Sequence, residues 1–164
     1  MKISELFSVK GKVAIVTGGS RGIGEMITAG FLANGAKVYI SARKELPLIQ
    51  KAQELSERYD GECIAIPCDL SSMEGIELFA QQIAEREDGI DFLINNAGAA
   101  WGETFEDFSE AGWDKVMDLN VKSIFFLTQK LKSLLTRNAS TEDPSRVINI
   151  GSIDGLNVPA FETY

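Results

Sequence analysis

The sequence predicts an α/β protein in which a parallel β-sheet is covered on both faces by helices. Short, continuously apolar segments alternate along the chain with longer segments whose apolar residues recur at helical spacing. Strands of this kind are typical of a parallel sheet that is buried on both sides. Because crossovers between parallel strands are right-handed, a doubly wound sheet is the simplest arrangement. Residues 1–164 show no internal repeat or low-complexity tract, so we expect a single domain.

The predicted strands are five short runs rich in β-branched residues, a composition that favours extended structure. They are Lys12–Thr17, Lys37–Ser41, Cys63–Pro67, Asp91–Asn95 and Arg146–Ile150.

The first two predicted helices follow the first two strands. In the first, Ile23, Ile27 and Phe31 recur every four residues, and Gly35 is the expected stop signal. The second covers about Pro47–Tyr59, with its proline in the first turn, where the missing N–H costs nothing.

The third and fourth helices flank the fourth strand. Ser71 and Glu74 have the spacing of a capping box, which predicts a helix that extends to about Glu87. A longer apolar periodicity predicts one continuous helix from about Trp113 to Arg137.

Composition excludes several classes of function. The formal charge is −8, with no stripe of Lys and Arg, which argues against a nucleic-acid surface. No apolar run is long enough to span a bilayer, and the first residues lack the apolar core of a signal peptide. Cys63 and Cys68 are too close in sequence to form a disulfide framework, so we expect reduced thiols in a cytoplasmic protein.

The sequence contains no histidine. This excludes a Ser-His-Asp or Cys-His hydrolase within the chain and removes the commonest catalytic zinc ligand, so we predict no metal site. Any proton transfer would depend on Tyr, Lys, Asp, Glu or a bound water.

A glycine-rich turn joins the first strand to the first helix in VTGGSRGIGEMI. Gly18, Gly22 and Gly24 have the spacing G-x-x-x-G-x-G, whereas the usual dinucleotide fingerprint is G-x-G-x-x-G. Glycines here permit a tight turn and close approach of the backbone to a phosphate at the helix N-terminus. The position favours nucleotide binding, with helix–strand packing as the alternative.

The end of the second strand indicates which dinucleotide is preferred. Proteins that bind NAD usually carry an acidic residue there to bond the ribose 2′-hydroxyl, but this strand ends in Ala42 and Arg43. Arg21, inside the glycine turn, supplies a second guanidinium. Paired N–H donors suit a 2′-phosphate, which favours NADP(H). The alternative for Arg43 is a solvated surface side chain.

Five motifs in order make the sequence resemble the classical short-chain dehydrogenase/reductase family. They are TGGSRGIG at Thr17–Gly24, CDL at Cys68–Leu70, NNAG at Asn95–Gly98, LNV at Leu119–Val121 and the strand that leads to Ser152. The phrases SRGIGEMI, AAWGETFEDF, GWDKVMDLNV and EDPSRVINIGS resemble NADPH-dependent 3-oxoacyl reductases within it. The family has a Rossmann-like fold, in agreement with the doubly wound sheet.

The resemblance implies roles for particular residues. Ser152 would hydrogen-bond the substrate carbonyl, and Asn120 would hold a water in a proton relay. The cofactor-binding residues would be Gly18, Ser20, Arg21, Gly22, Ile23, Gly24, Arg43, Asp69, Leu70, Asn96, Ala97 and Gly98.

The family's proton donor is a tyrosine, followed four residues later by a lysine that lowers its pKa. Tyr164 lies twelve positions after Ser152, slightly short of the family spacing, and no lysine follows it. We therefore expect the catalytic pair, and the rest of the sheet, to lie beyond Tyr164; the alternative is that Tyr164 itself is the catalytic tyrosine. The domain would then be incomplete at its C-terminus, with Arg146–Ile150 as an apolar edge strand.

The resemblance implies a cytoplasmic NADPH-dependent reductase that acts on a small-molecule ketone or acyl thioester of the 3-oxoacyl type. The complete protein would be a homodimer or homotetramer, without nucleic-acid or membrane partners. If the protein really ends at Tyr164, the alternative is a catalytically inactive NADP-binding or dimerisation module.

Overall fold

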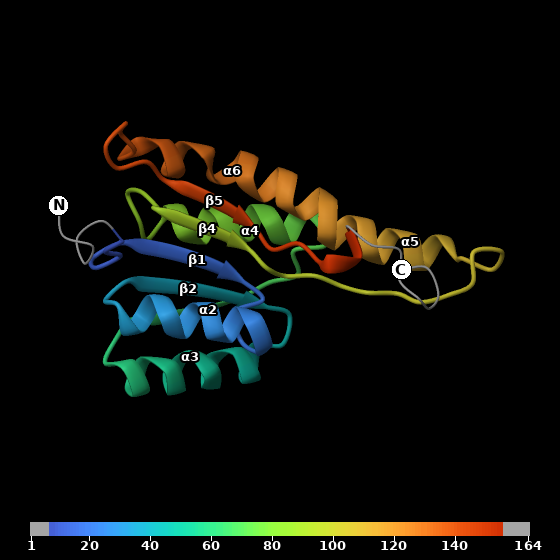
Figure 1. Ribbon diagram of the computed structural model, residues 1–164, viewed down its shortest axis with the longest axis horizontal. Coiled ribbons are helices and arrows are strands. Elements are labelled where there is room, and N and C mark those ends of the chain that lie inside the picture. Colours follow the sequence, from blue (N-terminus) through green and yellow to red (C-terminus); the bar gives the residue numbers. More distant parts are fainter. Residues whose placement is uncertain (1–6, 156–164) are drawn as a thin grey trace.

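Five parallel strands form the centre of the computed structural model, which describes residues 7–155 (Figure 1). The strand order across the sheet is β3-β2-β1-β4-β5, and every neighbouring pair is parallel. The strands are β1 (Val13–Thr17), β2 (Lys37–Ala42), β3 (Cys63–Pro67), β4 (Phe92–Asn95) and β5 (Arg146–Asn149). The chain adds β2 and β3 on one side of β1 and then β4 and β5 on the other, so the winding direction reverses between β1 and β4.

Helices cover both faces of this sheet (Figure 1). They are α2 (Gly22–Ala33) and α3 (Glu45–Tyr59) on one face, and α4 (Met73–Ala84) and α6 (Ser123–Arg137) on the other. A further helix, α5 (Glu110–Met117), extends beyond the carboxyl ends of the strands (Figure 1). A π-helical turn, η1 (Asp118–Lys122), joins α5 to α6, and a short 3-10 turn, η2 (Ile153–Gly155), follows β5. The predicted doubly wound, Rossmann-like fold is confirmed.

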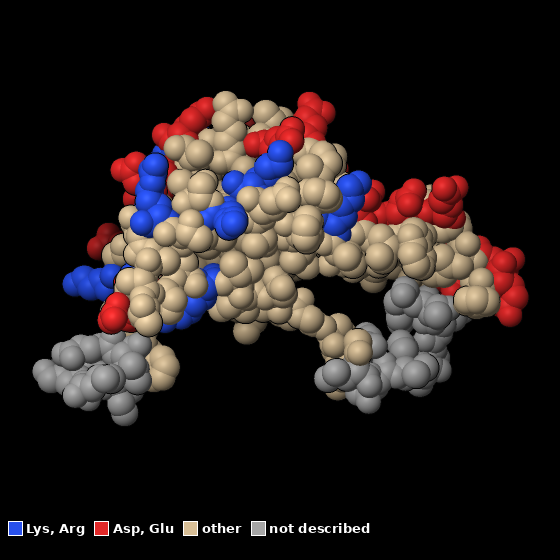
Figure 2. All heavy atoms as spheres, turned by 90° about the horizontal axis from the view of Figure 1, so that it is seen from above, with Lys and Arg blue, Asp and Glu red and all other residues tan. Residues whose placement is uncertain are grey.

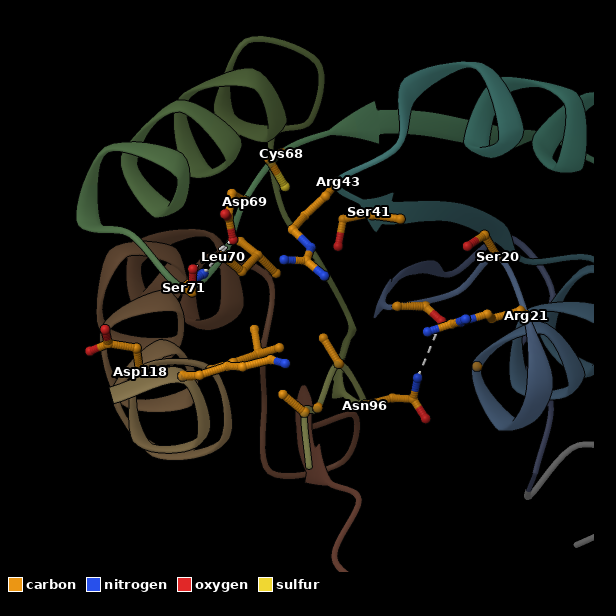
Figure 3. A pocket seen from close by; sticks show the side chains of 18 of the residues that line it. Ser20, Arg21, Ser41, Arg43, Cys68, Asp69, Leu70, Ser71, Asn96 and Asp118 are labelled. Atoms are coloured by element: carbon orange, nitrogen blue, oxygen red, sulfur yellow. Dashed lines mark hydrogen bonds between the residues drawn. The ribbon is translucent and has the colours of Figure 1, made fainter. Parts of the chain in front are cut away.

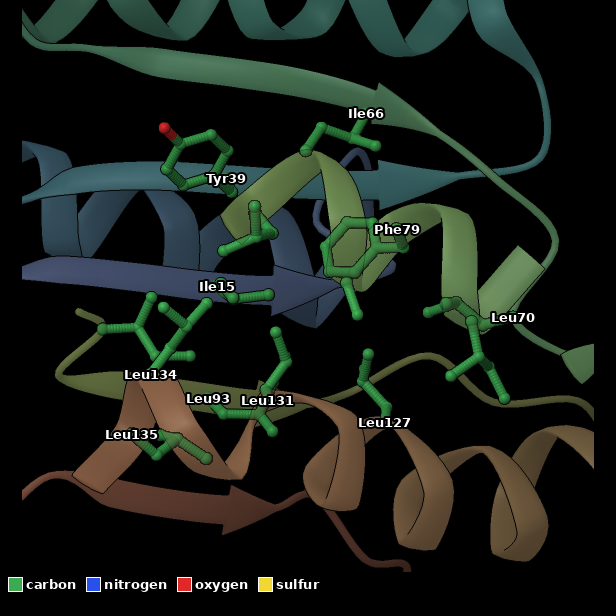
Figure 4. Close-up of a cluster of buried hydrophobic side chains, with 14 residues drawn as sticks. Ile15, Tyr39, Ile66, Leu70, Phe79, Leu93, Leu127, Leu131, Leu134 and Leu135 are labelled. Atoms are coloured by element: carbon green, nitrogen blue, oxygen red, sulfur yellow. The ribbon is translucent and has the colours of Figure 1, made fainter. Parts of the chain in front are cut away.

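The sheet separates two apolar cores because successive side chains of a strand point to opposite faces. Ala14 and Val16 of β1 pack with Leu32 of α2 and Leu48 of α3. Ile15, between them in sequence, faces the other core, which α4 and α6 cover. Figure 4 shows this second core, in which Phe79 of α4 and Leu131 of α6 meet Tyr39 and Leu93 of the sheet.

The start and the end of α4 differ from the prediction. Ser72, not Ser71, caps the helix, because its Oγ accepts a hydrogen bond from Gly75 N at 3.1 Å. Ser71 donates instead from its N and its Oγ to the Asp69 carboxylate, at 3.0 and 2.7 Å. The predicted capping box is therefore wrong, because Ser71 bonds to the Asp69 carboxylate instead of capping the helix. The helix ends at Ala84 rather than Glu87.

The long helix predicted from Trp113 begins earlier and is not regular. It starts at Glu110, where Ser109 Oγ accepts from Gly112 N at 3.1 Å. At η1 the N–H of Ser123 donates to the Asp118 carbonyl, five residues back, and the Ser123 hydroxyl donates to the Leu119 carbonyl at 2.6 Å. Such π-turns are rare and often mark functional positions.

Two of the predicted boundaries agree with the structure. Gly35 adopts φ +79°, and its N–H donates to Leu32 O at 2.9 Å, as a helix stop requires. Pro47 lies in the first turn of α3, although that helix already begins at Glu45.

The strand β5 forms one edge of the described sheet, as predicted for Arg146–Ile150. Its last regular residue is Asn149, and Ile150 N continues the pairing by donating to Asn95 O at 2.9 Å. Val147 and Ile148 of this strand are each 42% exposed.

Within residues 7–155, no helix has the length and apolar character needed to cross a membrane. Figure 2 shows one face of the molecule, on which Lys and Arg side chains are interspersed with acidic ones rather than joined in a continuous band.

Candidate functional site

A cavity of about 470 Å³ lies at the carboxyl ends of β1, β2, β3 and β4 (Figure 3). Gly18, Ala42, Cys68 and Asn96 come at or just after these four strand ends, and all four line it. The cavity therefore lies where the winding direction of the sheet reverses. Open α/β sheets bind their ligands at this position.

The glycine turn forms one wall of the cavity. Gly18 adopts φ +65°, and a Cβ placed on Gly24 would lie only 2.3 Å from the Gly18 carbonyl oxygen. Glycine at position 24 therefore allows the first turn of α2 to pack directly on the end of β1. Ile23 and Gly24 line the cavity, which brings the N-terminus of α2, with its partial positive charge, to the site.

The segment after β4 braces this turn. Thr17 Oγ accepts hydrogen bonds from the backbone N–H groups of Asn96 and Ala97, both at 2.9 Å. The Asn96 side chain donates to the Thr17 carbonyl at 2.9 Å and lies against Gly18. Asn95 is buried and donates to Asn149 of the neighbouring strand at 2.9 Å. The NNAG motif thus holds together the strand ends that surround the cavity.

Two arginines point into the cavity from different elements. Arg43 follows β2 and Arg21 precedes α2, and Figure 3 shows both guanidinium groups directed toward the middle of the pocket. Neither side chain makes an ion pair, a hydrogen bond or a ring contact with any part of the chain that the structure describes. Ala42 occupies the end of β2, so no carboxylate stands there to neutralise them.

The segment after β3 forms another wall of the cavity. Asp69 and Leu70 line the cavity, and the Asp69 carboxylate is held by the two bonds from Ser71. Burial raises the pKa of the Cys68 thiol beside them to about 12. Ser41 is 1% exposed and lines the same wall, where its hydroxyl interacts with the Cys68 thiol and offsets part of this rise in pKa.

All but one of the predicted cofactor-binding residues line this cavity. The exception is Gly22, which contributes a φ of +55° to the turn at the start of α2. The sequence prediction did not include the other lining residues, which are Ser41, Ala42, Cys68, Ser71, Ala99, Lys115, Asp118 and Leu119. Lys115 of α5 and Asp118 of η1 reach the site only through the packing of this helical segment. No feature of the sequence indicated that packing.

Asn120 lies in the π-turn and does not line the cavity. Its Oδ1 accepts from Ala99 N and its Nδ2 donates to Ala99 O, both at 2.8 Å. These two bonds attach the loop that carries Gly98 to the α5–α6 helix pair. Both polar atoms of the Asn120 side chain are thus bonded to backbone, and the water relay stays a prediction.

Ser152 is exposed and lies between β5 and η2, near the same edge of the sheet as the cavity. Its carbonyl accepts from Gly155 N at 3.1 Å, and it is not among the cavity-lining residues. Its catalytic role stays a prediction. Tyr164 lies outside the described residues.

The loop after NNAG is fixed to α5. A Cβ on Gly112 would lie 2.4 Å from the ring of Trp101, so the indole packs directly on the helix backbone. Glu103 Oε2 accepts from Ser109 N at 2.7 Å, and this bond lowers the pKa of Glu103. The ammonium of Lys115 lies 4.4 Å from the centre of the Trp101 ring.

Fold and cavity together define the class: a doubly wound, Rossmann-like protein with a cationic cleft where the winding reverses. The short chain dehydrogenase family matches residues 12–164. The chain belongs to this family, and the predicted resemblance is confirmed.

The chain is similar to known proteins of this family in both sequence and structure. The chain is 48% identical over 158 residues to a rhamnolipids biosynthesis 3-oxoacyl-(acyl-carrier-protein) reductase of Pseudomonas aeruginosa, covering 96% of the chain and 61% of the relative. The RhlG/NADP active-site complex of Pseudomonas aeruginosa superposes with a TM-score of 0.91 at 49% identity, again covering 96% and 61%. L-Sorbose reductase of Gluconobacter frateurii, complexed with NADPH and L-sorbose, gives 0.86 at 28% identity, covering 93% and 57%. The chain thus spans about three-fifths of these proteins.

Proposed function

We propose that this protein is an NADPH-dependent oxidoreductase and that the cavity binds NADP(H). The observation that carries the proposal is the pair of guanidinium groups, Arg21 and Arg43, which enter one cavity and form no ion pair within residues 7–155. A 2′-phosphate supplies the negative charge and the acceptor oxygens that this pair lacks. The NADP and NADPH complexes of the related structures support the same choice.

Residues at the cavity can be assigned to successive parts of the cofactor. The N-terminus of α2 and the glycine turn would take the pyrophosphate, and Asp69 with Leu70 would lie along the adenine. Asn96, Ala97 and Gly98 would support the ribose on the nicotinamide side. The cofactor would supply the hydride for the reaction.

The substrate we propose is a ketone of the 3-oxoacyl thioester class, because the Pseudomonas aeruginosa relative is a 3-oxoacyl-(acyl-carrier-protein) reductase. The Ser152 hydroxyl would donate a hydrogen bond to the substrate carbonyl and stabilise the charge that develops on its oxygen. Asn120 would keep the Gly98–Ala99 loop in place through its two bonds to Ala99. We assign proton donation to no residue of the described structure.

The test is NADPH oxidation by the protein expressed from its complete gene, with a short 3-oxoacyl thioester as substrate. We expect Ser152→Ala to lower kcat by roughly 10²–10³-fold, as loss of an oxyanion donor does, while the NADPH dissociation constant stays the same. Ser140→Ala, in the loop before β5, is the control. Absence of turnover, or full activity of Ser152→Ala, would contradict the proposal; NADPH binding without turnover would favour the inactive binding module.

The predicted homodimer or homotetramer stays part of this proposal. Exposed apolar side chains on one helical stretch, Trp113, Val121 and Phe125, would suit a contact between subunits. Light scattering of the purified protein measures the oligomeric state directly, and a monomer would contradict it.

A further inference from the structure

A third cation, Lys115, lines the same cavity from α5. Its side chain is exposed, and its ammonium lies over the Trp101 ring at 4.4 Å from the centroid. Arg21 and Arg43 belong to the glycine turn and to the end of β2, so Lys115 approaches the cavity from a separate part of the fold.

The charge of Lys115 is not neutralised within residues 7–155. The nearest candidate along the helix is Asp118, three residues later, since side chains three and four apart are neighbours on a helix. Asp118 instead accepts from Lys122 at 3.0 Å, and its carboxylate points away from the middle of the pocket in Figure 3. Asp118 is therefore already paired with Lys122.

The position of Lys115 is set by contacts that do not depend on a ligand. Trp101 packs on Gly112, one turn before Lys115, and the Glu103–Ser109 bond closes the loop between them. An ammonium over an indole at an exposed site is held only weakly. A ligand with several phosphate charges would therefore compete successfully for it.

From these contacts we infer that Lys115 is a third cationic ligand of the bound cofactor, contacting its phosphate-bearing adenosine part from the α5 side. The inference rests on the proposed function, since it takes the cavity to be the NADP(H) site. Lysine suits this task because its charge sits at the end of a flexible stem and needs no fixed donor geometry. The extra 2′-phosphate gives Lys115 more charge to attract in NADPH than in NADH, so it adds to cofactor selectivity.

The experiment is calorimetric titration of the wild type and of Lys115→Met with NADPH and with 2′,5′-ADP. The matched control is Lys132→Met, which removes an exposed α6 lysine that does not line the cavity and has no ion pair in the described residues. We expect Lys115→Met to weaken both ligands roughly three- to tenfold, because the charge acts at a partly solvated site. Lys132→Met should change them less than about twofold, since it lies outside the cavity.

Three further variants test the charge of Lys115 and its neighbours on the helix. Lys115→Arg should retain most of the affinity, because it keeps the charge. Lys122→Met should weaken NADPH binding more than Lys132→Met does, because the released Asp118 would draw Lys115 away. Adding Asp118→Asn to Lys122→Met should restore the affinity.

The outcomes separate this inference from the function that it assumes. If the wild type does not bind NADPH, the proposed function fails and the inference fails with it. If the wild type binds NADPH, and folded Lys115→Met binds it no more weakly than Lys132→Met, Lys115 is not a ligand and the proposed function stands. Circular dichroism of each variant confirms that it is folded.

Discussion

Asn120 shows how one side chain connects two parts of the site. Its amide donates to and accepts from the backbone of the same residue, Ala99, and so reproduces the pairing of a neighbouring strand. The carbonyl and N–H groups of Ala99 are partly buried, so they would be costly to leave without partners.

We therefore predict that Asn120→Leu, which keeps the size but removes both bonds, lowers the free energy of unfolding by about 2 kcal/mol. Urea denaturation followed by circular dichroism measures this loss. Gln129→Leu, an exposed amide on α6, is the control and should change the stability by less than about 0.5 kcal/mol. Equal stabilities of the two variants would show that the Ala99 contact contributes little.

The two cysteines provide a comparison within the same molecule. Burial raises the pKa of both Cys63 and Cys68 to about 12, but only Cys68 lines the cavity. The thiolate is the reactive form, so its fraction at pH 8 should be on the order of 10⁻⁴ and should rise about tenfold per pH unit below that pKa.

We predict that iodoacetamide modifies both thiols slowly in the folded protein, and faster as the pH rises. NADPH should slow the reaction of Cys68 further and leave Cys63 unchanged, since only the former lies where the cofactor would bind. Peptide mass mapping after timed alkylation distinguishes the two sites. Equal effects of NADPH on both thiols would argue against cofactor in this cavity.

At the scale of the elements, α5 is positioned by a glycine that contacts an indole. Alanine normally stabilises a helix interior relative to glycine. At Gly112 the added Cβ would come within 2.4 Å of the Trp101 ring, whereas at Gly30 of α2 it would meet nothing within 4 Å. The same substitution should therefore have opposite signs at the two positions.

We predict that Gly30→Ala raises the free energy of unfolding by roughly 0.5–1 kcal/mol, the usual gain in a helix. Gly112→Ala should lower it by roughly 1–3 kcal/mol, because Trp101 must move to relieve the overlap. Chemical denaturation of the two variants, each compared with the wild type, gives both values. A stabilising Gly112→Ala would mean that the Trp101 loop is not held against α5.

The helices also show what local pattern can and cannot predict. Runs of β-branched residues located the five strands of the described sheet, and apolar spacing together with proline and capping signals located its helices, with α5 and α6 expected as one helix. Local pattern did not distinguish Ser71 from Ser72 as the cap of α4. The choice depends on Asp69, because its carboxylate accepts a hydrogen bond from the Ser71 hydroxyl and leaves Ser72 to cap the helix. Local pattern also missed the π-turn at Asn120, because a π-turn keeps the surrounding residues helical and changes only the hydrogen bonding.

At the scale of the whole molecule, the chain carries a net charge of −8, yet three cations meet in one cavity. Several other cations are paired with acids, as Lys12 is with Asp91 and Lys51 with Glu25. The place of Arg21 and Arg43 at the cavity could be predicted from sequence, because Arg21 lies in the glycine turn and Arg43 follows the second strand. The third cation could not, since Lys115 reaches the cavity only through the packing of α5 against the loop after NNAG.

The proposed function requires above all that this cavity recognises a 2′-phosphate. Calorimetric titration of the protein with NADPH and with NADH tests that claim directly. We expect the wild type to bind NADPH at least about tenfold more tightly, and Arg43→Ala to lose most of this preference, since a charge-assisted hydrogen bond pair would be gone. Arg137→Ala, which removes only exposed contacts with the carboxylate and the carbonyl of Asp88, is the control. Equal affinity of the wild type for the two dinucleotides would contradict the account.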